Sequence, residues 1–264
     1  MIIIISIILL ILLLGYILLL YKLHDFKLPS LQLCEMLNEE DGRCKVLIIY
    51  PHPDDETMNN GGLIAKLVQD EKFDVTIVST SYGEKGNQVL DLPPQELMKV
   101  REEEFSKVMR YFGVKSYEIW NFGDGEHRYR ETEIKNKVRE YLTENEFDLV
   151  ITYERSGIYG HKDHITLSKV IYELHKELGS FKVLYSTLSK QMFEKIELPT
   201  YMASEGLENM RGLAEYKLNI VKDLNKKYNA AKIYESQDLT QGKPLWLYKA
   251  LGIYEYYTSK YTNN

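Results

Sequence analysis

Short continuous apolar runs alternate with helical patterns from residue 45 onward. The runs predict buried strands at residues 46–50, 75–78, 117–120, 149–152 and, more weakly, 183–185. Between them, apolar residues spaced three and four apart predict helices over residues 97–112 and 167–178. Strands that alternate with helices in this way are typical of a parallel sheet with helices on both faces. The predicted fold is therefore α/β, a Rossmann-like three-layer sandwich with a mostly parallel sheet.

The pattern becomes weaker past residue 190. A helix is expected near Gly212 to Asn229, and most tyrosines from Tyr248 onward are expected in strands or core. In open α/β sheets, ligands bind outside the carboxyl ends of the strands. The chemistry is therefore expected in the segments that follow four predicted strand ends, at Tyr50, Thr80, Trp120 and Thr152.

Residues 1–21 contain no charged side chain and consist almost wholly of Ile and Leu. A helix of about 20 apolar residues spans the hydrocarbon core of a bilayer. A secretory signal peptide would need a basic start, a shorter apolar stretch and a small-residue cleavage site, and none of these is present. We therefore predict a transmembrane anchor at residues 1–21, a linker that acts as a tether at 22–43, and one catalytic domain at 44–264.

The charged residues favour one orientation in the membrane and disfavour one class of partner. Lys22 and Lys27 follow the apolar stretch and no Lys or Arg precedes it, which favours a single-pass membrane protein with a cytoplasmic catalytic domain. The formal net charge is -6, with acidic and basic residues interspersed. A nucleic-acid binder usually carries a basic face, so no nucleic-acid partner is expected. Cys34 and Cys44 alone give neither a disulfide framework nor a zinc-finger spacing.

A cluster of one imidazole and three carboxylates follows the first predicted strand, at His52, Asp54, Asp55 and Glu56. Mutual repulsion makes such a cluster costly unless a cation neutralises it. A helix N-cap would also explain an acidic residue here. It needs only one Asp, however, and explains neither the histidine nor the flanking prolines.

Two more histidines, His161 and His164, follow the fourth predicted strand. Three apart at a helix start, they can face the same side. Together with the first cluster they match an open catalytic zinc site, which has three protein ligands and leaves a position for water. The isolated histidines His24, His127 and His175 are expected to be ordinary core or surface side chains.

The two clusters, His52-Pro53-Asp54-Asp55-Glu56 and His161-Lys162-Asp163-His164, resemble the paired signature of the LmbE-like, or PIG-L, N-acetylglucosaminyl deacetylases. The resemblance covers most of residues 45–240. It extends to further positions, which are Gly61-Gly62, residues 83–87, Arg101, Glu104, Tyr159, Gly160 and Ser236-Gln237. The family often has proline at the position of Lys162, which is not a ligand. The resemblance implies Zn²⁺-dependent hydrolysis of the N-acetyl group of an amino-sugar, although a two-histidine, one-aspartate site would accept several divalent metals.

The resemblance also implies roles for individual residues. The metal ligands would be His52, Asp55 and His164. Asp54 would be the general base, and His161 would stabilise the oxyanion or protonate the leaving amine. Asp163 would hold the tautomer of His161, and Tyr159 would help to stabilise the tetrahedral intermediate. Amide hydrolysis needs a nucleophile, a Lewis acid on the carbonyl and a proton for the amine, and these roles supply them.

Three polar residues, Asn87, Arg101 and Asp124, could contact sugar hydroxyls from neighbouring loops, or could be ordinary loop polars and a helix salt bridge. Two other functions remain open. One is a catalytically inactive module of the same fold that binds a glycan or a metal. The other is a metal-dependent phosphohydrolase, for which the glycines between Gly83 and Gly86 with Lys85 give weak support.

Overall fold

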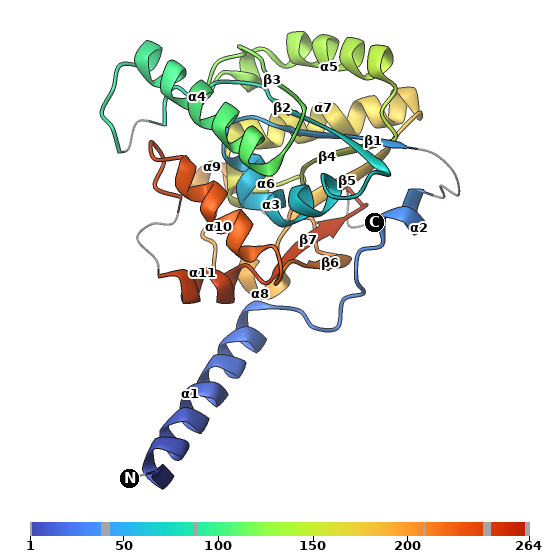
Figure 1. The fold of residues 1–264 in the computed structure, drawn as a ribbon. Coiled ribbons are helices and arrows are strands. Elements are labelled where there is room, and N and C mark those ends of the chain that lie inside the picture. Colours follow the sequence, from blue (N-terminus) through green and yellow to red (C-terminus); the bar gives the residue numbers. More distant parts are fainter. Residues whose placement is uncertain (1, 38–42, 87–88, 208–209, 240–243, 262–264) are drawn as a thin grey trace.

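The computed structural model of the protein describes residues 2–37, 43–86, 89–207, 210–239 and 244–261 (Figure 1). Seven strands form one sheet in the order β3-β2-β1-β4-β5-β7-β6. The strands are β1 (Cys44–Tyr50), β2 (Phe73–Ser79), β3 (Ser116–Ile119), β4 (Leu149–Tyr153), β5 (Lys182–Thr187), β6 (Tyr216–Asn219) and β7 (Tyr254–Thr258). The first five are parallel, and β7 pairs antiparallel with both β5 and β6. The predicted fold class is confirmed.

Helices cover both faces of the sheet and divide the core into two parts. Alternate side chains of β1 point to opposite faces because successive residues of a strand alternate. Val46 and Ile48 face a cluster shared with α3, α4 and α10, whereas Leu47 and Ile49 face a cluster shared with α5 and α7. The helices are α3 (Asp55–Leu67), α4 (Pro94–Phe112), α5 (Glu131–Asn145), α7 (Lys162–Leu178) and α10 (Leu224–Ile233).

All five strands predicted from apolar runs are present, and the two predicted helices correspond to α4 and α7. The helix expected over 212–229 is wrong for its first half. Tyr216–Asn219 forms the edge strand β6, and α10 begins only at Leu224. The reason is tertiary pairing: β6 hydrogen-bonds to β7, which lies more than thirty residues further along the chain.

The helix α1 (Ile2–Leu23) projects from the domain, and Figure 1 shows it standing apart from the sheet. Within it, Ile3–Leu23 has a mean hydropathy of 3.3 and is long and apolar enough to cross a membrane by length and composition. The residues from Ile3 to Leu18 are all exposed. An apolar helix without a covering partner is typical of a lipid-facing segment.

The segment that follows α1 does not behave as a free tether in its described part, so that expectation is wrong for residues 23–31. Leu23, His24 and Leu31 are buried against the domain. His24 bonds through Nδ1 to the hydroxyl of Tyr256 at 2.9 Å and through Nε2 to the carbonyl of Ala250 at 2.7 Å. We call residues 23–31 the strap. The short helix α2 (Leu33–Leu37) follows it, and residues 38–42 lie outside the described part.

Polar contacts fasten the strap along the edge strand β6. The amide of Leu31 donates to the carbonyl of Lys217, and the amide of Lys217 donates to the carbonyl of Pro29. The ammonium of Lys217 donates to the carbonyl of Phe26 at 2.5 Å. The strap satisfies the outer edge of β6, which would otherwise expose unpaired backbone groups. The boundary of the catalytic domain at residue 44 stays a prediction.

Candidate active site

Two loops meet because β1 and β4 are parallel neighbours in the sheet. Their carboxyl ends therefore lie at the same edge. His52 follows β1, and Asp55 begins α3. His161 and His164 follow β4, at the start of α7, after the short helix α6 (Gly157–Gly160). The topology thus brings together the two motifs that are more than one hundred residues apart in the sequence.

Three ligand atoms form a nearly equilateral triangle. Nδ1 of His52 lies 3.2 Å from Oδ2 of Asp55 and 3.3 Å from Nε2 of His164. Nε2 of His164 lies 3.4 Å from the same Asp55 oxygen. Tetrahedral bonds of about 2.0–2.2 Å to a zinc ion place the ligand atoms about 3.3–3.6 Å apart. The donor set and its spacing therefore fit a divalent metal held by these three residues.

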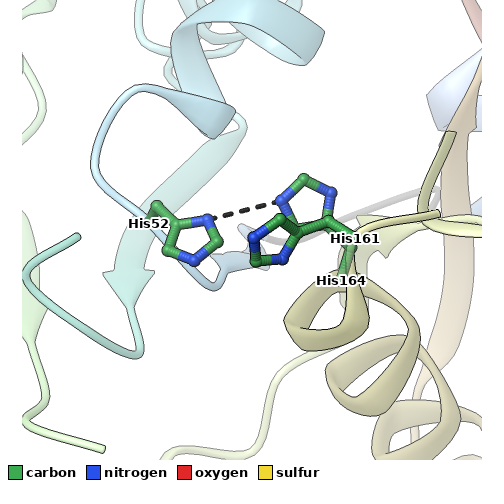
Figure 2. A group of neighbouring side chains, drawn as sticks. All are labelled: His52, His161 and His164. Carbon is green, nitrogen blue, oxygen red and sulfur yellow. Dashed lines mark hydrogen bonds between the residues drawn. The ribbon is translucent and has the colours of Figure 1, made fainter. Parts of the chain in front are cut away.

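His161 lies beside this triangle (Figure 2). Nitrogen atoms of His52, His161 and His164 all lie within 4.8 Å of one another, so the three histidines form a looser group that also suits a metal. Nδ1 of His161, however, accepts the backbone N–H of Asp163 at 3.2 Å. That bond occupies Nδ1 and leaves the proton of the neutral ring on Nε2. Asp55 is therefore the better third ligand, and His161 is better suited to donate a hydrogen bond.

The second nitrogen of His52 is held by two carboxylates. Nε2 lies 3.1 Å from Oδ1 of Asp124 and 3.3 Å from Oδ2 of Asp163. Contacts of this kind keep the proton on Nε2 and leave the Nδ1 lone pair free for a metal. Asp124, expected from the sequence as a sugar contact, therefore lies against His52. Asp163 touches His161 with its backbone and directs its carboxylate to His52.

Asp54 occupies a strained position with a positive φ of 108°. Oδ2 of its carboxylate accepts from Arg101 at 2.8 Å, and its amide donates to Glu56 at 2.9 Å. Arg101 also donates to the carbonyl oxygens of Pro53 and Gly83. Strain of this kind persists only where surrounding contacts hold it. The structure therefore fixes Asp54 at the cavity wall.

Burial raises the pKa of Asp54 to about 7, and the Arg101 guanidinium opposes that rise. Burial also acts to raise the pKa of Asp55. The neighbouring His164 and His52 outweigh the effect of burial, and they hold the pKa of Asp55 below its usual range. Burial lowers the pKa of His164 to about 3. The two adjacent aspartates thus have opposite protonation behaviour, as expected for a base beside a ligand.

A cavity of about 580 Å³ begins at this site. Asp54, Asp55 and Tyr159 are among the residues that line it. The ring of Tyr159 makes an edge contact with His164, with centroids 5.1 Å apart. Of the other expected sugar contacts, Asn87 lies outside the described residues, and Arg101 is paired with Asp54.

A phosphohydrolase would need basic residues that bind phosphate, but Lys85 and Arg101 are both paired with acidic groups. Lys85 forms a 2.6 Å ion pair with Glu126, and its amide donates to Asp124. Arg101 is paired with Asp54. A phosphate site would direct such cations and amides toward the ligand. The described residues therefore give that alternative no support.

Residues 47–175 match the family model described as PIG-L, GlcNAc-PI de-N-acetylase. The chain carries a PIG-L (LmbE-like) family domain. Among its relatives is the 1D-myo-inositol 2-acetamido-2-deoxy-alpha-D-glucopyranoside deacetylase of Corynebacterium glutamicum (strain R), 25% identical over 202 residues. The match covers 68% of this chain and 65% of that protein, so the chain spans just under two thirds of the relative's length.

Solved structures share the fold of the PIG-L domain. The N,N'-diacetylchitobiose deacetylase from Pyrococcus horikoshii matches with a TM-score of 0.60 and 22% identity, over 86% of this chain and 89% of that one. The zinc inhibited form of teicoplanin deacetylase Orf2 matches with a TM-score of 0.62 and 17% identity, over 81% and 96%. At these identities the likeness establishes the shared architecture and leaves the substrate open.

Two residues of the PIG-L domain site were missed by sequence reasoning. Tyr153 donates to Oδ1 of Asp55 at 2.6 Å and stacks on His164, with centroids 4.0 Å apart. The sequence did contain one signal for Tyr153, because it lies at the end of β4, where functional residues of an open α/β sheet are expected. His127, expected to be an ordinary side chain, is fully buried. Its Nδ1 lies 3.0 Å from Asp163, and its Nε2 lies 2.6 Å from the Thr80 hydroxyl. A single histidine with no other functional residue type beside it in the expected pattern gives no local signal of such a contact.

Proposed function

We propose that the chain is a zinc-dependent hydrolase that removes the acetyl group from an N-acetylglucosamine-type glycoside or glycolipid. The observation that carries the proposal is the triangle of His52, Asp55 and His164 beside a cavity that Asp54 also lines. Two histidines and one carboxylate with open positions are typical of catalytic zinc centres. Membership of the PIG-L family and the names of its relatives as deacetylases support the same reaction.

The roles of the residues follow from their contacts. When bound, the metal supplies a Lewis acid for the amide carbonyl and lowers the pKa of water. Asp54 takes a proton from the attacking water, and its pKa of about 7 suits a group that also returns this proton to the leaving nitrogen. The C–N bond then breaks to give a free amine and acetic acid, which loses a proton to become acetate. Water and the amide together supply every atom of these products.

Two donors face the carbonyl oxygen as it gains charge. His161 donates from Nε2, because Nδ1 accepts the N–H of Asp163. Tyr159 lines the cavity, and burial raises the pKa of its hydroxyl, which keeps the proton available for donation. Asp163 and Asp124 hold His52 in the tautomer that leaves Nδ1 free. Among the residues that the structure describes, no carboxylate bonds to the imidazole of His161, whose Nδ1 accepts a backbone N–H instead.

We also propose that α1 anchors the enzyme as a single-pass span with the catalytic domain in the cytoplasm. Its length, exposure and lack of charge between Ile3 and Tyr21 support the anchor. The orientation rests on Lys22 and Lys27, which follow the span. Substrates on a lipid, in the cell envelope or free in solution are all compatible with such an enzyme.

An acetate-release assay tests the proposed function. Full-length protein in detergent micelles, loaded with zinc, is incubated with N-acetylglucosamine glycosides that carry sugar, inositol or lipid aglycones. We expect equal amounts of acetate and free amine from at least one of them. Folded, zinc-loaded protein that binds a glycoside but releases no acetate would instead support a binding module. Release of phosphate from a phosphorylated sugar would support a phosphohydrolase.

Replacing Asp163 with asparagine should weaken metal binding by about 10–100-fold, the usual effect of losing a partner of a ligating histidine. Asp163 is fully buried and contacts Nε2 of His52. The amide can present an N–H to His52 and so no longer favours one tautomer. Zinc affinity is measured by competition with a chelating dye. Asp124→Asn should act in the same direction, because Asp124 contacts the same nitrogen at 3.1 Å. Unchanged affinity in both folded variants would contradict the assigned role.

Replacing Arg101 with glutamine should move the acid limb of the kcat/KM profile to higher pH. Asp54 must be ionised to act as a base, and the guanidinium of Arg101 lowers its pKa. Without that charge the pKa rises, so activity is lost at a higher pH as the solution is acidified and is regained on the alkaline side. A bound dication lowers the pKa in both proteins, which leaves the direction of the difference unchanged.

Arg101→Lys is the matched control, since it keeps the charge at this position. Profiles are recorded at saturating zinc for the three proteins. An equal loss of activity by Arg101→Gln at every pH would show that Arg101 acts on the fold and not on the protonation of Asp54.

A further inference from the structure

The helix α11 (Leu245–Leu251) presents an exposed tryptophan next to the base of α1. The side chain of Trp246 is 61% exposed, whereas the other tryptophan of the chain, Trp120, is 8% exposed. α1 contacts α11 and the short helix α8 (Lys190–Phe193). Figure 1 shows both helices along the edge of the domain from which α1 projects. What distinguishes Trp246 is its place, in a helix that contacts the apolar helix α1.

The contacts of α1 determine how close this edge of the domain lies to the membrane. Side chains from Ile3 to Leu18 are exposed, whereas Leu19 and Leu20 are partly buried. About 20 residues of helix, at 1.5 Å each, match the hydrocarbon thickness of about 30 Å. If Ile3 to Leu20 lie in the hydrocarbon, the part of the domain that covers Leu19 and Leu20 reaches the membrane boundary.

The strap prevents this edge from moving away from the span. His24, which directly follows α1, bonds to the carbonyl of Ala250 in α11 at 2.7 Å. The hydroxyl of Ser189, at the start of α8, donates to the carbonyl of Leu23. Lys195, just after α8, donates to the carbonyl of Lys22 at 3.2 Å. Both helices are therefore attached within one turn of the end of α1.

We propose that α11 and α8 form a second membrane contact, in which the indole of Trp246 enters the interface of the bilayer that α1 crosses. This proposal rests on the anchor proposed above and does not depend on the reaction. Tryptophan and tyrosine collect at the boundary between headgroups and chains, where an apolar ring with one polar group is best accommodated. Tyr21, in the last turns of α1, is a second exposed aromatic near the end of the span, with 64% of its side chain exposed. Lys195, whose ammonium group bonds to the carbonyl of Lys22, supplies a basic group beside the end of α1 that would face the headgroups.

The cavity of the proposed active site shares part of its wall with this membrane contact. Met192 belongs to α8 and Tyr248 to α11, and both line the same cavity as Asp54. Tyr256, which lines the same cavity, bonds to His24 of the strap. The membrane contact therefore places the part of the cavity wall formed by α8 and α11 beside the lipid headgroups.

Tryptophan fluorescence tests this proposal without any assay of catalysis. Trp120→Phe leaves Trp246 as the single tryptophan, and Trp246→Phe leaves Trp120. Each full-length protein is reconstituted into vesicles of phosphatidylcholine and phosphatidylglycerol, with or without lipids brominated in the upper part of the acyl chain. We expect brominated lipid to quench the Trp246 protein strongly and its emission to shift to the blue. The Trp120 protein should be unaffected, because Trp120 is buried and directly follows β3, a strand that Figure 1 shows on the side of the domain away from α1.

Three results would overturn the proposal. One is a Trp246 protein that floats with the vesicles but keeps the emission of a water-exposed indole and is not quenched. Another is protein that fails to float with the vesicles at all, which would remove the anchor itself. A blue shift without quenching by brominated lipid would mean that protein, such as a second copy of the chain, covers Trp246, and it would also overturn the membrane contact. None of these outcomes depends on acetate release. The proposed reaction is therefore tested independently of the membrane contact.

Discussion

Replacing Asp54 with asparagine should lower kcat by about 10²–10⁴-fold, the usual contribution of a positioned general base. Asparagine has nearly the same shape and can still accept the hydrogen bond from Arg101, which lies 2.8 Å from the carboxylate. It cannot take a proton from water. The carboxylate of Asp54 is not one of the three atoms of the metal triangle, so zinc content should stay unchanged. The loss should therefore appear in kcat, measured by acetate release, with binding preserved.

Asp70→Asn is the matched control, because Asp70 is exposed in the turn after α3 and lies outside the site. It should leave kcat unchanged. An Asp54→Asn protein that kept its zinc and retained kcat within a few-fold of the original would place the base elsewhere. Loss of zinc from Asp54→Asn would instead indicate that Asp54 is itself a ligand.

Replacing His164 with alanine should remove the metal and, with it, the activity. Nε2 of His164 forms one corner of the triangle, 3.3 Å from Nδ1 of His52. Only two protein ligands would remain, and the buried Asp55 would lose one of the two histidines that favour its charged form. Zinc affinity should fall by more than about 10–100-fold, which is the usual loss when only a hydrogen-bond partner of a metal ligand is replaced. Zinc content is measured by elemental analysis after dialysis, and kcat by acetate release.

Thermal unfolding provides an independent measurement of the same site. A ligand that binds only the folded state stabilises it, so zinc should raise the Tm of the original protein and not that of His164→Ala. His175→Ala is the matched control on the same helix. Its ring bonds to the carbonyl of Phe181 and lies outside the cavity. If His164→Ala bound zinc as tightly as the original protein, the triangle would not be the metal site. Removal of zinc by a chelator should reproduce the loss of activity, and added zinc should reverse it.

The parts of the fold that apolar runs predicted are those buried on both faces. Val46 to Tyr50 and Leu149 to Thr152 form continuous apolar runs because helices cover both sides of these central strands. The edge strand β6 reads Tyr-Lys-Leu-Asn, which is too short and too polar to be distinguished from part of a helix. Its strand character comes from pairing with β7 and the strap, and no local pattern carries that information.

The candidate site was predictable where several functional residues lie within one short segment. His52 with Asp54 and Asp55, and His161 with His164, form such groups at the ends of two strands. Contacts made by single residues were not predictable. The carboxylate of Asp163 faces His52 and His127 because the loop after β3 brings His127 across the site, with its amide 3.3 Å from Asp163. Sequence spacing does not determine the direction in which such a side chain points.

The position of β7 in the sheet has a consequence for the order in which the chain can fold during synthesis. β7 lies between β5 and β6, so β6 has no neighbour in the sheet until residues 254–258 have left the ribosome. Glu255 of β7 accepts the amides of Gly62 and Leu63 in α3, and Tyr256 holds His24. Domains generally begin to fold from the N-terminal side while synthesis continues. The first five strands and both histidine motifs can therefore assemble early, whereas the contacts that β7 makes with α3 and with His24 form only when β7 has been synthesised.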